Sequence, residues 1–246
     1  MLPEHIVRSI SFVRAMCSLS SWFTGQVGDG RENALLEHVR QTSAKGDPQS
    51  VLQAADAYSQ RTWFMNVGNE KGALVDAAVR DRNPKVALEL GTYCGYSAVR
   101  ISSQFQQPES LLISIEKSPP NAEIAKQIID HAGLSSKCEV LQGTLTKRVQ
   151  DVKDILKKFD QQFIDFVFLD HAKEFYLSDY LLLKNEHLIG PGTVIVADNM
   201  GFPGSPKFWK YLKNAEELET VSHKCTLEYI SWVRDTVAVS TYKSGF

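Results

Sequence analysis

Oxygen-bearing side chains directly follow two apolar runs of the sequence. Asp170 comes after the run 164–169, and Asp198 and Asn199 come after the run 193–197. Both runs are too continuously apolar for half-exposed strands, which predicts that they form central strands of a parallel sheet. Ligands of such sheets bind where the strands end, so these side chains should converge at the carboxyl edge if the two strands are neighbours. Three hard oxygen donors then predict a magnesium site.

Each of these residues also has a simpler interpretation. An aspartate after a strand is often the N-cap of the next helix, and a lysine in the first turn of a helix is usually exposed to solvent. Two observations favour metal ligation with a base beside it. Asn199 places an amide next to the second carboxylate, and Lys173 follows Asp170 by three residues.

A second group of candidate ligands surrounds a glycine loop that follows an earlier strand and opens a helix. Gly91 and Gly95 have the spacing Gly-x-x-x-Gly, which does not support the pyrophosphate cradle of a dinucleotide site. Glu89 suits a cationic ammonium group, and Glu116 ends the next strand, where an acid accepts ribose hydroxyls. Adenosine with a cationic amino-acid tail and no phosphate describes S-adenosylmethionine. The two glycines alone are equally consistent with a simple tight turn.

The candidate sites lie on a predicted alternation of strands and helices. Strands are predicted at 86–90, 111–115, 138–141, 164–169 and 193–197, and helices between them at 97–105, 121–132, 145–159 and 175–185. Helical periodicity also covers 31–41 and 48–63, and two strand-like pieces at 227–230 and 236–242 predict an antiparallel C-terminal edge. The fold class predicted is α/β: a Rossmann-like doubly wound, mostly parallel seven-stranded sheet with helices on both faces.

The length of 246 residues favours one α/β domain, at 28–246, preceded by an N-terminal extension at 1–27. Within the extension, Arg8 and Arg14 interrupt the apolar stretch 6–23, so we expect neither a spanning helix nor a signal peptide. Its helical spacing predicts a docking helix or partial disorder, with an interfacial membrane helix as the weaker alternative.

Composition narrows the choice of compartment and partner. The four cysteines are widely spaced without a Cys-x-x-Cys pair, which predicts reduced thiols and a cytoplasmic protein. Cys94, beside the glycine loop, is expected to be a packed thiol because it has no identifiable base partner. The formal net charge of -2 gives no basic footprint for nucleic acid or anionic membrane. We expect a small-molecule substrate and a monomer.

From about residue 28 to residue 243, the chain resembles the catechol O-methyltransferase family. The matching segments are 63–68 (Trp-Phe-Met-Asn-Val-Gly), 88–100, 167–171, 197–199, 202–204 (Phe-Pro-Gly) and 227–229 (Leu-Glu-Tyr). The resemblance implies a class I methyltransferase fold that uses S-adenosylmethionine and Mg²⁺. It also implies methyl transfer to a catechol or a related phenol.

The resemblance further implies a role for each matching residue. The metal ligands are Asp170, Asp198 and Asn199, and the general base is Lys173. The substrate contacts are Asp170, Lys173, Asn199, Glu228, Trp63 and Pro203. The cofactor contacts are Met65, Val67, Glu89, Gly91, Tyr93, Ser97, Glu116, Lys117, Thr144, Asp170 and His171. Trp63 and Pro203 are otherwise ordinary core and turn residues, His171 packs against the cofactor, and Glu228 is otherwise a solvated strand acid.

Two positions depart from the family pattern. Ala172 stands where catechol enzymes carry a tryptophan, which removes an aromatic wall shared by the cofactor and substrate pockets. Residues 143–146 read Gly-Thr-Leu-Thr where the family has Gly-Ala-Ser-Gln, which changes the polar contacts to adenine. Both departures bear on substrate and cofactor fit, whereas the reaction type depends on other residues.

The expected chemistry follows from the residue types. A phenol has a pKa of about 10 and is a poor nucleophile at neutral pH. A magnesium ion chelated by the two adjacent hydroxyl oxygens of a diphenol favours the phenolate form. Lys173 is placed to accept the proton as a neutral amine. The sequence therefore predicts a magnesium-dependent O-methyltransferase for vicinal diphenols. Two alternatives stay open: an enzyme for a bulkier phenol, and a cofactor-binding protein that has lost turnover.

Overall fold

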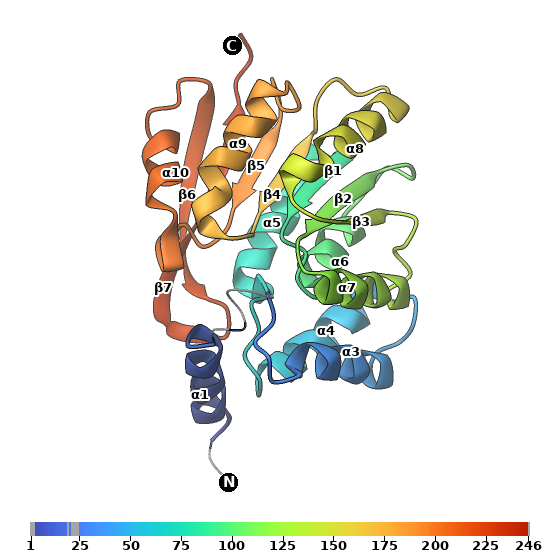
Figure 1. Ribbon diagram of the computed structural model, residues 1–246, viewed down its shortest axis with the longest axis vertical. Coiled ribbons are helices and arrows are strands. Elements are labelled where there is room, and N and C mark those ends of the chain that lie inside the picture. The colour runs from blue at the N-terminus through green and yellow to red at the C-terminus, as the bar shows by residue number, and fades with distance from the viewer. Residues whose placement is uncertain (1–2, 19, 21–24, 246) are drawn as a thin grey trace.

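The computed structural model describes residues 3–18, 20 and 25–245. A single seven-stranded sheet runs through it in the order β3-β2-β1-β4-β5-β7-β6 (Figure 1). The strands are β1 (Val86–Leu90), β2 (Leu111–Glu116), β3 (Cys138–Gln142), β4 (Phe166–Leu169), β5 (Val194–Ala197), β6 (Leu218–Leu227) and β7 (Ile230–Tyr242). The first five are parallel, and β7 pairs antiparallel with both β5 and β6. The predicted α/β fold is confirmed.

Helices cover both faces of the sheet. One face packs against α5 (Gly68–Arg82), α6 (Tyr96–Ser103) and α7 (Pro119–His131), with α3 (Arg31–Thr42) and α4 (Pro48–Ser59) contacting α7 and α6. The other face packs against α8 (Leu145–Lys158), α9 (Tyr176–Asn185) and α10 (Pro206–Leu212). Short helical turns at Lys173–Phe175 and Met200–Gly204 follow β4 and β5. These two turns are the connections that carry the predicted metal ligands.

The central strands β1, β4 and β5 are apolar apart from Glu89, and this composition favours a sheet that is covered on both faces. All residues of β1 and β4 are buried, including Glu89 within β1. A continuous apolar run can only sit in a sheet that helices cover on both faces. From β1 the chain adds β2 and β3 on one side and then β4 and β5 on the other, so the strand order reverses between β1 and β4. Ligands of doubly wound sheets bind at this reversal.

The C-terminal edge differs from the prediction. The segment 227–230 was expected to be a strand, but Leu227 ends β6, Ile230 begins β7, and the two residues between them form the turn. Tyr229 in this turn has a φ of 61°. The residue types Leu-Glu-Tyr-Ile are typical of a strand, and only the long-range pairing of β6 with β7 makes them a turn.

The helix predictions contain one overextension and two omissions. The helix expected at 48–63 ends at Ser59, and its continuation is a loop that carries Trp63. The sequence patterns did not predict α5 or α10. In α5 the glycine at position 72 and the buried lysine at position 71 obscure the apolar face.

A helix lies near the N-terminus, within the predicted extension. It is α1 (Glu4–Met16), and Figure 1 shows it beside the turn that joins β6 to β7. Its Phe12 is 5% exposed and packs edge-on against Trp63 with ring centroids 5.0 Å apart. Positions 1–2, 19 and 21–24 of the extension lie outside the described residues.

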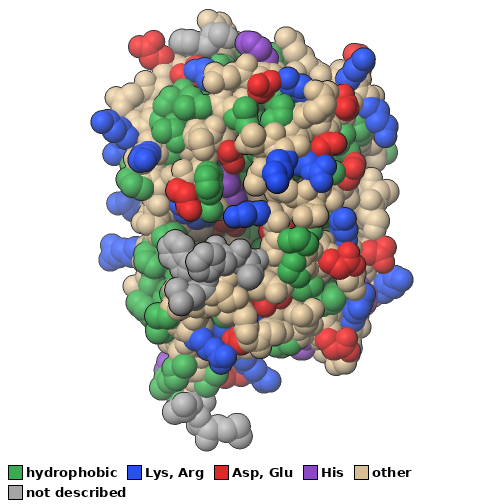
Figure 2. All heavy atoms as spheres, in the orientation of Figure 1, with side chains coloured by type: hydrophobic (Ala, Val, Ile, Leu, Met, Phe, Trp, Pro, Cys, Tyr) green, Lys and Arg blue, Asp and Glu red, His purple; other side chains and the backbone are tan. Residues whose placement is uncertain are grey.

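The surface carries charged side chains of both signs (Figure 2), and most of the cysteines are buried. Figure 2 shows Lys and Arg side chains interspersed with Asp and Glu over one face of the molecule. All four cysteines are free, and three of them are buried. Among the described residues, no helix has the length and apolar character needed to cross a membrane.

Candidate functional site

The two predicted metal-binding arms leave the sheet side by side. Leu169 at the end of β4 pairs with Ala197 at the end of β5, so Asp170 and Asp198 follow at the same level. The Asp198 N–H donates to the Leu169 carbonyl at 3.0 Å. The neighbour relation assumed from the sequence is therefore present, and both carboxylates emerge at the carboxyl edge.

Asn199 is held in an unusual backbone conformation that turns its side chain toward β7. Its φ is 52°, and its own N–H donates to Asp198 Oδ1 at 2.7 Å. The side-chain Nδ2 donates to Asp235 Oδ2 at 2.9 Å. Because the amide nitrogen is taken by Asp235, the amide oxygen is the atom left to act as a ligand.

These donors fit a hard divalent cation. Burial raises the pKa of Asp170 to about 6, with Lys173 opposing the shift and Asp198 adding to it. The half-buried carboxylate of Asp170, the buried carboxylate of Asp198 and an amide oxygen are ligands of the kind that Mg²⁺ prefers. The described part of the chain contains no group of three or more His, Cys, Asp or Glu side chains that could hold a metal ion. A site here therefore depends on the amide of Asn199 as its third protein ligand.

Lys173 begins the short turn after β4 and points back to the first arm. Its Nζ donates to Asp170 Oδ1 at 2.9 Å and to the Tyr176 hydroxyl at 2.7 Å. Tyr176 is fully buried, and its hydroxyl donates to the Leu169 carbonyl at 2.7 Å. Tyr176 was not among the predicted site residues. The available signal was its position, three residues after Lys173 at the start of a helix.

Lys71 is the second residue that sequence reasoning missed. It lies in α5, is 1% exposed, and places its Nζ 2.8 Å from Asp198 Oδ2 and 2.6 Å from Glu228 Oε2. Asp235 Oδ2 is also within 3.0 Å of this ammonium group. Burial opposes the charge on Lys71, but these carboxylates hold its pKa well above the usual value.

Glu228 is a buried turn residue that lies beside this lysine, so the alternative of a solvated strand acid is wrong. Burial, opposed by Lys71, raises the pKa of Glu228 to about 7. Gly68 makes this proximity possible, because a Cβ at that position would lie 2.9 Å from the Cβ of Glu228. The first turn of α5 thus packs directly against the β6–β7 turn.

The glycine loop lies against the first metal-binding arm. A Cβ on Gly91 would stand 2.5 Å from the Asp170 carbonyl oxygen, and its φ is 96°. Only glycine satisfies both conditions without displacing the backbone. The loop expected to bind a cofactor and the arm expected to bind a metal are therefore in backbone contact.

Glu89 and Glu116 lie next to this loop. Glu89 is fully buried, accepts a hydrogen bond from the Ser114 hydroxyl, and leaves Oε1 with no hydrogen-bond partner among the described residues. Burial raises its pKa to about 7. Glu116 accepts the N–H groups of Tyr93 at 2.8 Å and of Ser118 at 2.7 Å. An orphaned buried carboxylate oxygen fits a cationic group that is not part of the chain.

The remaining predicted cofactor contacts differ in their exposure. Ser97 is buried at the start of α6, Val67 is buried, and Met65 is half-buried. His171 stacks against Tyr176 with ring centroids 4.9 Å apart, and burial lowers its pKa. Lys117 and Thr144 are exposed just beyond β2 and β3.

The residues predicted to form walls of the substrate pocket differ in their exposure to solvent. Trp63 is 2% exposed, and its Nε1 donates to the Glu228 carbonyl at 3.0 Å. Phe12 of α1 covers one side of it, while Pro203 is exposed after β5. Ala172 is also exposed, so the place of the family tryptophan is open to solvent.

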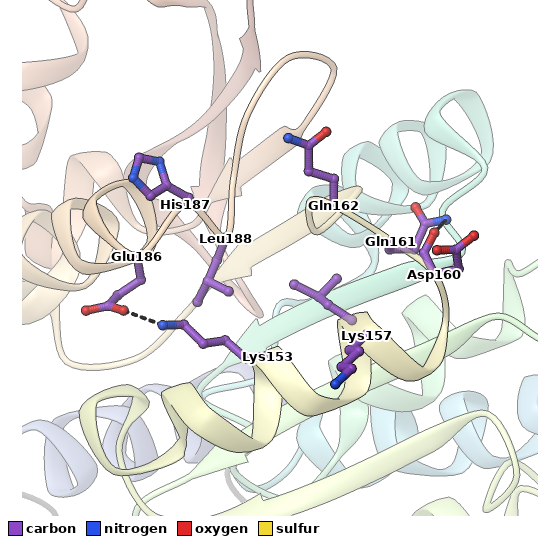
Figure 3. A pocket seen from close by; sticks show the side chains of 9 residues that line it. Lys153, Lys157, Asp160, Gln161, Gln162, Glu186, His187 and Leu188 are labelled. Carbon is purple, nitrogen blue, oxygen red and sulfur yellow. Dashed lines mark hydrogen bonds and ion pairs between the residues drawn. The ribbon is translucent and has the colours of Figure 1, made fainter.

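A surface hollow lies at the opposite edge of the sheet. It has a volume of about 580 Å³ and is lined by α8 and the segments that precede β4 and β5 (Figure 3). Lys153 and Glu186 form an ion pair of 2.6 Å across it. Because it sits at the starts of the strands, it is remote from the candidate ligands.

Comparison with known proteins identifies the relatives of this chain. A family model described as O-methyltransferase matches residues 40–209. Catechol O-methyltransferase of Mus musculus is 42% identical over 208 residues, which cover 84% of this chain and 77% of the mouse protein. A probable O-methyltransferase of Mycobacterium tuberculosis is 39% identical over 223 residues, covering 89% of this chain and 95% of that protein.

Solved structures show the same fold. The O-methyltransferase from Bacillus cereus, solved in complex with SAH, has a TM-score of 0.63 and 21% identity, and the match covers 85% of this chain and 91% of that chain. TomG from Streptomyces achromogenes, solved with SAM, has a TM-score of 0.62 and 20% identity, and the match covers 99% and 100%.

The fold and the matched sequence define a methyltransferase enzyme. The chain belongs to the O-methyltransferase family that includes the catechol O-methyltransferases.

Proposed function

We propose that this enzyme transfers a methyl group from S-adenosylmethionine to one hydroxyl of a catechol, with the help of Mg²⁺. One observation carries the proposal: at the carboxyl edge Lys173 pairs with Asp170, and the neighbouring arm of Asp198 and Asn199 shares the Lys71 ammonium with Glu228. Lys173 and Glu228 reach this place from segments that are 55 positions apart in the sequence. The homology to catechol O-methyltransferases of Mus musculus and Bos taurus supports the choice of substrate class.

The cofactor would lie over the glycine loop. Bound S-adenosylmethionine supplies an electrophilic methyl group on a sulfonium centre. In our proposal, the unsatisfied Oε1 of Glu89 accepts a hydrogen bond from the amino-acid ammonium of the cofactor. Glu116, already fixed by two backbone N–H groups, accepts the ribose hydroxyls. The remaining predicted contacts, from Met65 to His171, are proposed to line the same ligand.

The acceptor would lie between the two arms and the β6–β7 turn. A magnesium ion held by Asp170, Asp198 and Asn199 supplies positive charge that favours the ionised form of a phenolic acceptor. Lys173 accepts the proton of the reacting hydroxyl, and Glu228 accepts a hydrogen bond from the second hydroxyl. Holding the oxygen in line with the methyl group contributes up to about 7–11 kcal/mol in well-oriented reactions.

The test is methyl transfer from labelled S-adenosylmethionine to a panel of catechols, with Mg²⁺ and with excess EDTA. The proposal expects transfer to at least one catechol and its loss when EDTA is added. Calorimetry with S-adenosylmethionine covers the alternative of a binding protein. Cofactor binding without transfer to any phenol would replace the proposed enzyme with that alternative.

A bulkier phenol is the second candidate substrate, because Ala172 is exposed where relatives of the catechol enzyme type carry tryptophan. An open wall admits an acceptor with a large substituent. We expect Ala172→Trp to lower kcat/KM for substituted catechols at least fivefold while leaving unsubstituted catechol within twofold. Equal effects on small and large acceptors would contradict this candidate.

A further inference from the structure

Asp235 in β7 collects hydrogen-bond donors from several parts of the site. It is 3% exposed, and its Oδ2 accepts from Lys71 Nζ at 3.0 Å and from Asn199 Nδ2 at 2.9 Å. Its Oδ1 accepts the backbone N–H groups of Gly201 at 3.1 Å and Phe202 at 2.9 Å, and that of Thr236. No role for Asp235 follows from the resemblance or from the sequence pattern.

These contacts hold the segment after β5, which carries the predicted ligands Asp198 and Asn199, against β7. The bond to Nδ2 settles which atom of the Asn199 amide faces the cation site, because the oxygen is left pointing away from Asp235. The bonds to Gly201 and Phe202 hold the turn that immediately follows this ligand. Asp235 thus controls both the rotation of one ligand side chain and the path of its backbone.

Lys71 extends the same control to Asp198, the other predicted ligand of this arm, and to Glu228 on the substrate side. Its ammonium is shared by Asp198, Glu228 and Asp235, all within 3.0 Å. On the first arm, Asp170 is paired in turn with Lys173, with Nζ 2.9 Å from Oδ1.

We propose that Asp235 is a positioning residue for the metal site, acting on Asn199 directly and on Asp198 and Glu228 through Lys71. It does not touch the cation or the acceptor. A buried ion pair alone would be weak evidence, because such pairs often stabilise little. What distinguishes Asp235 is that its partners include a predicted ligand side chain and the backbone after it. The inference rests on the proposed function only for the presence of a cation.

The test measures Mn²⁺ binding to the full chain without cofactor or acceptor, using the electron paramagnetic resonance signal of free Mn²⁺. We expect Asp235→Asn to weaken Mn²⁺ binding at least fivefold, because one amide oxygen cannot accept from Asn199 and Lys71 as a carboxylate does. Binding of S-adenosylmethionine, measured by calorimetry, should stay within threefold.

Asp165 offers a matched control at the other edge of the sheet. It is 8% exposed, pairs with Arg82, and accepts the backbone N–H groups of Lys85 at 2.8 Å and Val86 at 3.1 Å. We expect Asp165→Asn and Asp235→Asn both to lower the urea midpoint, and Asp165→Asn to leave Mn²⁺ affinity within twofold of the wild type. Equal Mn²⁺ affinity in the two variants would overturn the inference.

The design distinguishes a folding defect, a failure of the proposed metal dependence and a failure of the inference about Asp235. If Asp235→Asn does not fold, the double variant Lys71→Met/Asp235→Asn removes the unpaired ammonium and is measured in its place, with the same expected loss of Mn²⁺ affinity. If the wild type itself does not bind Mn²⁺, the metal dependence in the proposed function fails. If the wild type binds and the folded variants bind equally well, only the inference about Asp235 fails.

Discussion

Glu89 carries a buried carboxylate with one oxygen that no described donor satisfies. This oxygen destabilises the unliganded protein, since an ionised group without a full set of hydrogen-bond partners is unfavourable in the interior. The same burial raises the pKa of Glu89 to about 7. The residue type alone predicted an affinity for a cation, but the sequence contained no sign that the carboxylate would be fully enclosed.

Glu89→Gln is expected to change how stability depends on pH. Because the pKa rises from 4.5 to about 7 on folding, the native protein binds more protons than the unfolded chain, and the wild type loses stability as pH rises through this range. The variant lacks this loss of about 3 kcal/mol, estimated from 1.4 kcal/mol per pKa unit. Urea unfolding at pH 5 and pH 8 measures it. A stability difference that is the same at both pH values would contradict the prediction.

Lys173→Met should remove the proposed base. We expect kcat for a simple catechol to fall by about 10²–10⁴-fold, the usual contribution of a positioned acid or base, with the KM for S-adenosylmethionine unchanged. Steady-state kinetics at saturating Mg²⁺ provide the measurement. Lys207→Met, at an exposed lysine of α10, is the control and should leave kcat unchanged. A similar kcat in both variants would exclude Lys173 as the base.

At the scale of elements, the sequence predicted best where one pattern is enough. The runs that became β4 and β5 are continuously apolar because helices cover both sides of the sheet, and that signal is local. The turn at Glu228 and Tyr229 could not be found in this way, since its residue types favour a strand. Its position is fixed by the pairing of β6 with β7 and by the packing of Gly68.

Helix α1 is the element whose contribution is easiest to isolate. Phe12→Ala should detach it from the β6–β7 turn, because Phe12 packs against both Trp63 and Trp232. A buried Phe→Ala change costs about 3–5 kcal/mol in a core, and here the loss falls on the docking of one helix. We expect faster amide exchange in Glu4–Met16 and a red-shifted tryptophan emission.

Ile10→Ala is the matched control for this helix, because Ile10 is 57% exposed. It should leave both amide exchange and emission close to those of the wild type. If Phe12→Ala also leaves them unchanged, α1 is not held by these aromatic contacts.

For the whole molecule, the sequence predicted the fold and the convergence of the two arms but not the residues behind them. The strand order follows from alternating strands and helices, and it places Asp170 beside Asp198. Lys71 and Asp235 are 164 positions apart, so no local spacing links them. A lysine in a helix is normally solvated, and its burial follows only from the three carboxylates that tertiary packing gathers around it.

Gly91→Ala tests a contact that joins the two halves of the site. The added Cβ would meet the Asp170 carbonyl at 2.5 Å in a backbone conformation with a φ of 96°. The variant should bind both S-adenosylmethionine and Mn²⁺ at least fivefold more weakly, as measured by calorimetry and by free Mn²⁺. Gly192→Ala has a similar φ of 86° with no neighbouring atom within 4 Å, and should affect neither. Loss of only one of the two affinities would contradict the prediction.

The contact at Gly91 also has a thermodynamic consequence. A ligand that orders the glycine loop changes the free energy of placing the Asp170 arm, and by linkage a cation on that arm changes the affinity of the loop ligand by the same factor. Saturation with one ligand would then lower the concentration of the other needed to fill the site. If the glycine loop binds S-adenosylmethionine and the Asp170 arm binds a cation, the close backbone contact at position 91 predicts that the two ligands bind cooperatively.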